Sequence, residues 1–297
     1  MLYDIRQTTS YSYQVPVRVV RQVLRMTPVD RPGHQHVIAH MLDVDPEPAE
    51  LMRGLDFFGN GLAWLTIDQP HGHLQITTRS RVEVSARALP DAAETPLVDD
   101  VRTLALEQPD LGPEAPAHGL FQSRAVPLDA EITDWAATSF RGDRPMLEAG
   151  LELMTRIKDD FAYQPGATHV ATAPHEAFAA RAGVCQDFAQ VMIAGMRGLG
   201  LPARYVSGYL RTIPPEGQPR LEGADATHAW VEIWCGPQHG WIGLDPTNAI
   251  PAGDDHIILA VGRDYADVSP VDGVIVSSGD HILSVGVDVA PVTPVAR

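Results

Sequence analysis

The chain has 297 residues, of which 44% are hydrophobic, so it can fill the cores of two domains and is not a disordered protein. Its net charge is −16 and its Lys and Arg residues are not clustered, which argues against nucleic acids and anionic membranes as partners and favours neutral or basic peptides. We find neither a signal-peptide pattern nor an apolar run of about 18 residues. We therefore expect a cytoplasmic protein without a membrane span.

The first part of the chain, residues 1–88, reads as a β-rich domain. Short runs rich in β-branched and apolar residues alternate with turn-forming residues, at 15–26, 34–44, 61–69 and 74–86. Several short strands at this close spacing are typical of an antiparallel sandwich. We therefore predict an N-terminal antiparallel β-sandwich domain.

Residues 89–140 have the composition of a connector. They are rich in Pro, Ala and acidic residues, most of all at 109–116, which predicts a partly helical linker outside any core. From residue 141 the pattern changes, and 146–157 predicts a helix. We place a second domain at 141–297, with residues 159–166 as a loop that leads toward the segment around Cys185.

Cys185 stands at the start of a strongly apolar helical pattern. Gly183 just before it permits a tight approach, and Gly198, Gly200 and Pro202 end the pattern. Between these limits apolar or small residues recur at steps of three and four, at positions 188, 191, 192, 195, 196 and 199. The first turn of a helix has unpaired N–H groups and a partial positive charge, and both stabilise a thiolate. The thiol of Cys185 is therefore well placed to ionise.

Three runs that follow are rich in β-branched and aromatic residues and predict strands at 203–210, 228–234 and 241–245. The second begins with His228 and the third ends with Asp245. A Cys on a helix that faces a His and an Asp on neighbouring strands is a workable catalytic triad. Two later runs, at 273–277 and 281–289, predict a hairpin that completes the same sheet.

Several motifs in order carry a family resemblance. They are Gly183-Val-Cys185-Gln-Asp, Gly200-Leu-Pro-Ala-Arg204-Tyr-Val, His228-Ala-Trp-Val-Glu232 and Trp241-Ile-Gly-Leu-Asp245-Pro-Thr-Asn248, with Tyr11-Ser-Tyr13, Pro16-Val17 and Asp56-Phe-Phe-Gly-Asn60 earlier and Gly262-Arg-Asp-Tyr265-Ala-Asp-Val-Ser-Pro270 later. Together they resemble the bacterial transglutaminase-like superfamily, relatives of papain-type cysteine proteases, and its N-terminal all-β domain. The resemblance implies an α+β fold, in which a β-sandwich precedes a core whose Cys-bearing helix packs on an antiparallel sheet.

The resemblance also implies roles for single residues. Cys185 matches the nucleophile, His228 the general base and then acid, and Asp245 the group that orients the imidazole, so that Asp245→Asn is expected to be a milder change. A thioester would form and then react with water or an amine. The backbone N–H of Cys185 is the first expected oxyanion donor. Candidates for the second donor or for substrate contact are Gln186, Tyr163, Tyr209 and Trp230. We read Asp187 and Glu232 as structural hydrogen-bonding partners.

Each of these residues also has a purely structural interpretation. Cys185 could be a packing residue, His228 a satisfied core histidine, and Asp245 a turn residue, because Asp-Pro-Thr-Asn is an ordinary turn signal. Cys185 and Cys235 could in principle form a disulfide, but the family reading needs Cys185 free.

No cofactor is expected for this chain. It has no phosphate-binding loop of the G-x-x-x-x-G-K-[ST] type and no EF-hand loop. Two groups of histidines have spacings compatible with metal ligation on a strand, but without a Cys or acidic partner at ligand spacing we predict no metal there. These groups are His34, His36 and His40, and His71 and His73.

Hydrolysis of a peptide, isopeptide or other amide bond in a peptide or protein substrate is the favoured activity, because bacterial members of the superfamily are regarded as protease-like. A protein-glutamine transamidase is one alternative, and it would need a second amine site that excludes water. A non-catalytic scaffold that binds peptides or partner proteins is the other.

Overall fold

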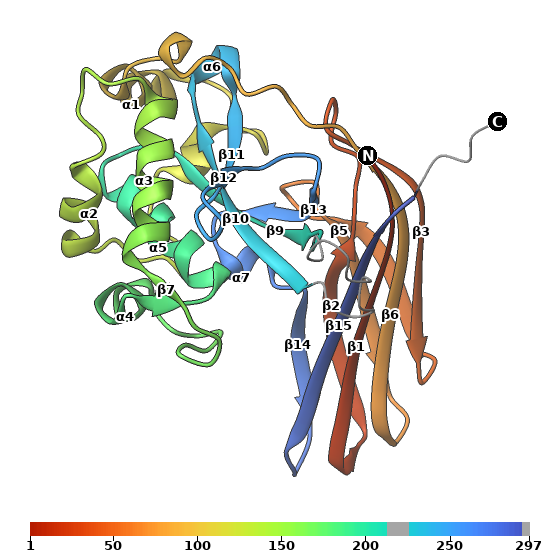
Figure 1. Cartoon of the computed structure of the whole chain (residues 1–297). Helices are drawn as coiled ribbons and strands as arrows, with labels where there is room; N and C mark the ends of the chain where they lie inside the picture. Colours follow the sequence, from red (N-terminus) through yellow and green to blue (C-terminus); the bar gives the residue numbers. More distant parts are fainter. Residues whose placement is uncertain (213–225, 293–297) are drawn as a thin grey trace, which may run out of the picture.

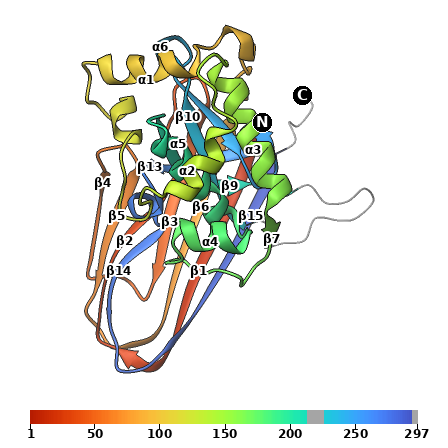
Figure 2. The same ribbon diagram turned by 90° about the vertical axis from the view of Figure 1, so that its left-hand side faces the viewer.

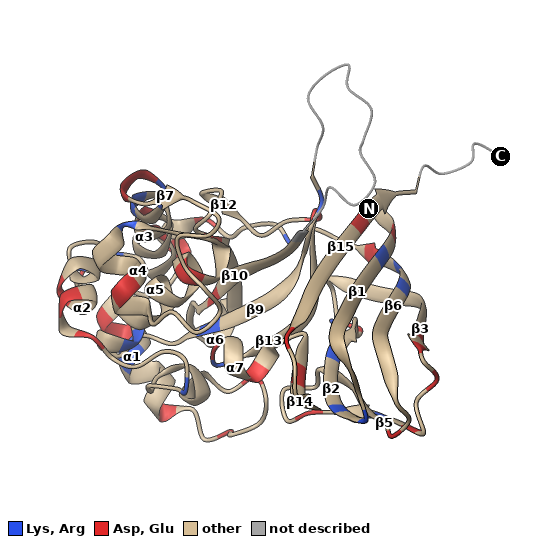
Figure 3. Cartoon of the chain, turned by 90° about the horizontal axis from the view of Figure 1, so that it is seen from below, with Lys and Arg blue, Asp and Glu red and all other residues tan. Residues whose placement is uncertain are grey.

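The computed structural model describes residues 1–212 and 226–292, which form a β-sandwich and a helix-covered sheet side by side (Figure 1). This confirms the predicted α+β architecture. Among the described residues, no helix combines the length and apolar character needed to cross a membrane. Acidic and basic residues are interspersed over both units (Figure 3).

The sandwich consists of two four-stranded antiparallel sheets. One has the order β15-β1-β6-β3 and the other β14-β2-β5-β4. Six of these strands come from the N-terminal region: β1 (Leu2–Val17), β2 (Val19–Thr27), β3 (Gln35–Asp45), β4 (Glu50–Leu55), β5 (Gly61–Ile67) and β6 (His71–Val84). Burial alternates along β1 and β2, because successive side chains point to opposite faces of a sheet. The inward set includes Tyr11, Leu24, Leu65 and Ile76.

The last two strands complete the sandwich and not the core sheet. β14 (Val271–Val276) pairs with β2, and β15 (His281–Pro291) pairs with β1 along its length, from Tyr3 opposite Pro291 to Tyr13 opposite His281. The prediction that these strands complete the core sheet is therefore wrong. An alternating pattern identifies a strand and its buried face, but it does not identify the partner strand.

The core sheet is antiparallel and has the order β12-β11-β10-β9-β13. Its strands are β9 (Ala203–Leu210), β10 (Ala226–Trp234), β11 (Trp241–Asp245), β12 (Ile250–Pro251) and β13 (His256–Gly262). The predicted strands at 203–210, 228–234 and 241–245 are confirmed. β13 was not predicted, because all seven of its residues are buried and the segment lacks the alternation of a half-exposed strand.

Helices cover one face of this sheet (Figure 2). The predicted helices are confirmed as α3 (Met146–Asp160) and α5 (Cys185–Gly198), and further ones are α4 (Pro174–Ala180), α6 (Gly236–His239) and α7 (Tyr265–Val268). Two short strands, β7 (Ala162–Tyr163) and β8 (Ala182–Gly183), pair in parallel beside the start of α5. α5 is buried along nearly its whole length, so it forms the centre of the helical layer.

The segment 89–140 belongs to this core, and its description as a linker outside the core is wrong. It contains η1 (Ala92–Glu94), α1 (Val98–Glu107), η2 (Pro116–Gly119) and α2 (Ala130–Ala137). Val98, Val101, Ile132 and Phe140 are buried in the same apolar cluster as α5. The frequent Pro residues keep these helices short, which hides their apolar spacing in the sequence.

Polar contacts from the sandwich reach β13 of the core sheet. Gln35 exchanges hydrogen bonds with the backbone of Ile258, at 2.9 Å in both directions. Asn60, whose amide also donates to Asp56, makes the same kind of pair with Val261, at 2.7 and 2.8 Å. The Asp56–Asn60 motif therefore serves to dock the two units against each other.

Candidate active site

The turn that leads into α5 is fixed by a buried carboxylate. Asp187, which is 2% exposed, accepts hydrogen bonds from the backbone N–H of Val184 at 2.8 Å and from the hydroxyl of Thr168 at 2.6 Å. Gly183 leaves room for this carboxylate, since a Cβ there would lie 2.6 Å from Asp187 Oδ2. Cys185 therefore enters the helix at a defined position, and Asp187 has the structural role that we expected.

Cys185 is the first residue of α5, and it is partly exposed and has a free thiol. The N–H groups of Asp187 and Phe188 both donate to Val184 O. Among the described residues, no acceptor is found for the N–H groups of Cys185 and Gln186. These two donors at a helix N-terminus make the surroundings of the sulfur favourable for negative charge.

His228 and Asp245 meet at the same place from two neighbouring strands. His228 lies on β10 and Asp245 ends β11, and the two strands pair in register along 231–234 and 241–244. His228 Nε2 donates to Asp245 Oδ2 at 2.8 Å, with side-chain exposures of 9% and 0%. The neighbouring Cys185 side chain also interacts with His228 and raises its pKa. Three residues predicted from the sequence thus come together in one chain of contacts.

The electrostatics of this group favour a charged imidazole. Burial lowers the pKa of His228, but hydrogen bonds with Asp245 and Cys185 outweigh this and raise the pKa to about 9. Burial raises the pKa of the Asp245 carboxyl, yet its bonds from His228, His256 and Asn248 hold it well below the usual range. At neutral pH the geometry therefore supports an imidazolium next to a carboxylate.

Two further residues bind Asp245 and were absent from the predicted site. Asn248 Nδ2 donates to Asp245 Oδ2 at 2.7 Å, and His256 Nε2 lies 3.3 Å from the same oxygen. Thr247 donates its backbone N–H to Asp245 Oδ1 at 2.9 Å. Asn248 was visible in the Asp-Pro-Thr-Asn motif. His256 carried no sequence signal, because it lies on β13, the strand that was missed.

Trp230, a predicted substrate contact, is buried and packs against both His228 and His256. Its ring lies 6.2 Å from that of His228 in a stacked arrangement and 5.1 Å from that of His256, edge to face. Gly208 on β9 makes this packing possible, since a Cβ there would come within 2.6 Å of the indole. With 1% of its surface exposed, Trp230 supports the two imidazoles and is not open to substrate.

The three other side chains predicted for the site, those of Tyr163, Gln186 and Tyr209, differ in whether they lie near Cys185. Tyr163 on β7 is 53% exposed, and burial and the neighbouring Cys185 raise its pKa. The Gln186 amide donates to the backbone carbonyl of Val170 at 3.0 Å. The Tyr209 hydroxyl is buried and donates to Gln7 of the sandwich at 2.5 Å. Tyr163 therefore remains near the sulfur, whereas Tyr209 belongs to the interface between the two units.

Glu232 lies further along β10, and Cys235 directly follows this strand at the start of α6. Glu232 accepts from Arg204 at 2.7 Å, as a structural partner should. Cys235 is a free, buried thiol, and burial raises its pKa to about 12. The sulfur suited to chemistry is therefore Cys185.

His228, Asp245 and His256 are close enough to be considered as metal ligands. The His256 ring argues against this, because its Nδ1 accepts the backbone N–H of Gly253 at 3.1 Å. The proton of the neutral ring is then on Nε2, the atom that a metal would need unprotonated. The residues therefore fit a hydrogen-bonded triad better than a metal centre.

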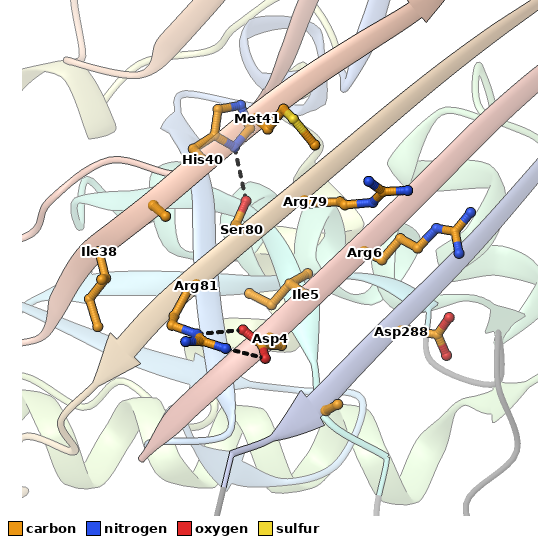
Figure 4. A pocket seen from close by; sticks show the side chains of 12 residues that line it. Asp4, Ile5, Arg6, Ile38, His40, Met41, Arg79, Ser80, Arg81 and Asp288 are labelled. Atoms are coloured by element: carbon orange, nitrogen blue, oxygen red, sulfur yellow. Dashed lines mark hydrogen bonds and ion pairs between the residues drawn. The ribbon is translucent and has the colours of Figure 1, made fainter.

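A cleft of about 660 Å³ lies far from this group, on the outer face of the sandwich (Figure 4). The residues that line it include both acidic and basic side chains. Arg81 donates two hydrogen bonds of 2.7 Å to Asp4, and Arg6 stands opposite Arg79 in the strand register. None of its lining residues comes from α5, β10 or β11, so this cleft does not hold the candidate catalytic residues.

Comparisons with known proteins agree with this geometry. Residues 3–83 match the bacterial transglutaminase-like N-terminal region, and residues 133–246 match the transglutaminase-like superfamily. A crystal structure of a candidate cysteine protease from Cytophaga hutchinsonii superposes with a TM-score of 0.73 at 21% identity, covering 100% of this chain and 92% of that one. The fold is thus the one shared by papain-like and transglutaminase-like proteins.

Sequence relatives lead to the same family. An uncharacterized protein of Mycobacterium tuberculosis is 41% identical over 261 residues, which cover 83% of this chain and 79% of the relative. A protein-glutamine gamma-glutamyltransferase of Pseudomonas aeruginosa is 38% identical over 135 residues, or 45% of this chain and 19% of that protein. The chain belongs to the transglutaminase-like superfamily and carries its bacterial N-terminal region.

Proposed function

We propose that the protein is a cysteine-dependent acyl-transfer enzyme with Cys185 as nucleophile, His228 as general base and acid, and Asp245 as the group that orients the imidazole. One observation carries this proposal. A nearly buried imidazole is hydrogen-bonded to a buried carboxylate and also interacts with a thiol at a helix N-terminus, and both raise its pKa. Three separate elements supply these groups, which is the arrangement that thiolate catalysis requires.

The proposed reaction begins with the thiol proton on His228. The thiolate of Cys185 attacks the carbonyl carbon of an amide, and the negative charge that develops on the carbonyl oxygen is stabilised by N–H groups of the first turn of α5. The C–N bond then breaks, and His228 gives its proton to the leaving amine. A thioester on Cys185 remains. Water attacks this thioester while His228 accepts a proton, and the product acid leaves with the thiol restored.

Hydrolysis of peptide, isopeptide or other amide bonds is the reaction that we favour. Cys185 and Tyr163 are partly exposed, so water can reach the sulfur, and Tyr163 is the remaining candidate for a side-chain contact with the substrate. The similarity over 135 residues to a protein-glutamine gamma-glutamyltransferase supports transamidation as a second candidate. The two reactions share the thioester and differ only in what attacks it.

Mass spectrometry distinguishes these candidates. The purified protein is incubated with a glutamine-containing peptide library, with and without a primary amine, and each peptide is examined for cleavage, ammonia release and amine incorporation. Cleavage or deamidation would support hydrolysis, and a mass gain of the amine would support transamidation. Cys185→Ala serves as the control and should abolish each product. Turnover retained in this variant would refute the proposed nucleophile.

A non-catalytic scaffold would behave differently toward iodoacetamide. An activated thiolate at Cys185 reacts well below about pH 8, whereas an ordinary thiol reacts only as the pH approaches its usual pKa of about 8.5. If Cys185 shows only the ordinary behaviour, the protein is better described as a binding module.

A further inference from the structure

A second buried histidine supports the carboxylate of the triad from the opposite edge of the core sheet. His256 is the first residue of β13 and is 1% exposed. In the sheet order, β10 and β9 separate β11, which carries Asp245, from β13. The segment after Asp245 turns back and pairs with β11 as β12, where Ala252 donates its backbone N–H to the carbonyl of Gly243 at 2.9 Å. This return brings the His256 ring to Asp245.

The hydrogen bonds of His256 fix its tautomer. Its Nδ1 lies 3.1 Å from the backbone nitrogen of Gly253, which can only donate, so Nδ1 must accept. The ring proton of the neutral form is then on Nε2, 3.3 Å from Asp245 Oδ2, where it can be donated to the carboxylate. In this tautomer His256 donates its Nε2–H to Asp245, and its Nδ1, which accepts from Gly253, takes no proton from His228.

The carboxylate that receives this bond has no exposed surface. Its Oδ2 atom accepts from His228 at 2.8 Å, from Asn248 at 2.7 Å and from His256 at 3.3 Å. These donors approach from three different elements or turns, so together they fix the plane of the carboxylate. The plane of the carboxylate in turn decides where the His228 ring points. Trp230 packs against both imidazoles, whose ring centroids lie 6.2 Å from each other.

We infer that His256 is a positioning residue for the reaction, because its Nε2–H holds the Asp245 carboxylate in the orientation that aims His228 at Cys185. This inference rests on the proposed function. The charged and titratable groups that face His228 are Asp245 and Cys185, with His256 behind the carboxylate. His34 also interacts electrostatically with His256 from the sandwich side.

The test uses the reactivity of Cys185 with iodoacetamide, which needs no substrate. Rate constants are measured by intact-protein mass spectrometry from pH 5 to 10 for the wild type, His256→Phe and His256→Gln. A hydrogen bond to a charged group contributes more than one between neutral groups, so we expect His256→Phe to react about tenfold to hundredfold more slowly at pH 6. Near pH 10 the two rates should converge, because the thiol then ionises without help from His228.

The conservative variant and a structural control separate positioning from stability. His256→Gln keeps an N–H donor at about the place of Nε2 and should recover most of the rate at pH 6. Gln35→Met removes the hydrogen bonds to Ile258 on the same strand without touching Asp245, so it should lower the melting temperature and leave the pH profile of alkylation unchanged.

The outcomes also separate this inference from the proposed function. If the wild type has no reactive thiol below pH 8, the proposed function fails. If the wild type is reactive and His256→Phe matches it at pH 6, the positioning role of His256 is refuted while the triad stands. If Gln35→Met slows alkylation as much as His256→Phe does, the effect comes from the stability of β13, and the inference is again wrong.

Discussion

Replacement of Asp245 by Asn should be far from mild, although the two side chains have nearly the same shape. Oδ1 of Asp245 accepts two backbone N–H groups, from Thr247 at 2.9 Å and Asn248 at 3.3 Å. Oδ2 accepts side-chain N–H groups of His228, Asn248 and His256. An amide has only one oxygen, so in either orientation its NH₂ group must face N–H donors. The sequence-based expectation of a mild effect does not take these donors into account.

The size of the effect follows from the pKa of His228. The difference between its ordinary value of 6.5 and about 9 corresponds to roughly 3 kcal/mol. The hydrogen bond with Asp245 is the largest of the contributions that raise this pKa. We assign it about 2 kcal/mol, which is about a 30-fold loss of the imidazolium–thiolate pair at neutral pH.

The assay is the pH dependence of Cys185 alkylation. In Asp245→Asn we expect the rate constant at neutral pH to fall by about 30-fold. Asp4→Asn is the matched control, since Asp4 pairs with Arg81 on the sandwich surface and should leave the profile unchanged. Coinciding profiles for Asp245→Asn and the wild type would refute the electrostatic reasoning.

Three further predictions concern the same region. Iodoacetamide at pH 7 should label Cys185 and spare Cys235, whose buried thiol has a pKa raised to about 12; peptide mapping that finds equal labelling would contradict this. Because the folded-state pKa of His228 is raised to about 9, its contribution to stability is complete below pH 6.5 and is lost as the pH rises through 9. The free energy of unfolding in urea should therefore fall by up to roughly 3 kcal/mol from pH 6 to pH 10, and this loss should be absent in His228→Gln. Gly183→Ala should destabilise the fold by about 1–3 kcal/mol, because its Cβ would displace the Asp187 carboxylate and leave buried donors unpaired; an unchanged melting temperature would show that the turn can relax.

Local patterns predicted much of this structure. The helix that begins at Cys185 was predictable from its periodic apolar face. The strands that carry His228 and Asp245 were predictable because they are rich in β-branched and aromatic residues and have turn residues between them. Their convergence at one point was implied by the family resemblance and could not be deduced from spacing.

The predictions that failed concern features that depend on contacts between distant parts of the chain. β13 is a short apolar run without alternation, which fits a fully buried strand as well as a piece of a buried helix, and it was not predicted, so His256 was missed with it. β15 was predicted as a strand, but its partner is β1, at the other end of the sequence. A strand with this pattern can pair with the edge of any of several apolar strands, and its own residues do not specify which one.

The placement of β14 and β15 makes the sandwich a discontinuous unit, because the entire core sheet with its helices is inserted between its sixth strand and its last two. β2 lacks one neighbour until the polypeptide has been made as far as residue 276, and β1 lacks one until residue 291. The docking bonds of Gln35 and Asn60 further couple the two halves. We therefore expect one concerted unfolding transition, and a shortened chain ending near Asp245 should leave two unpaired strand edges that invite aggregation.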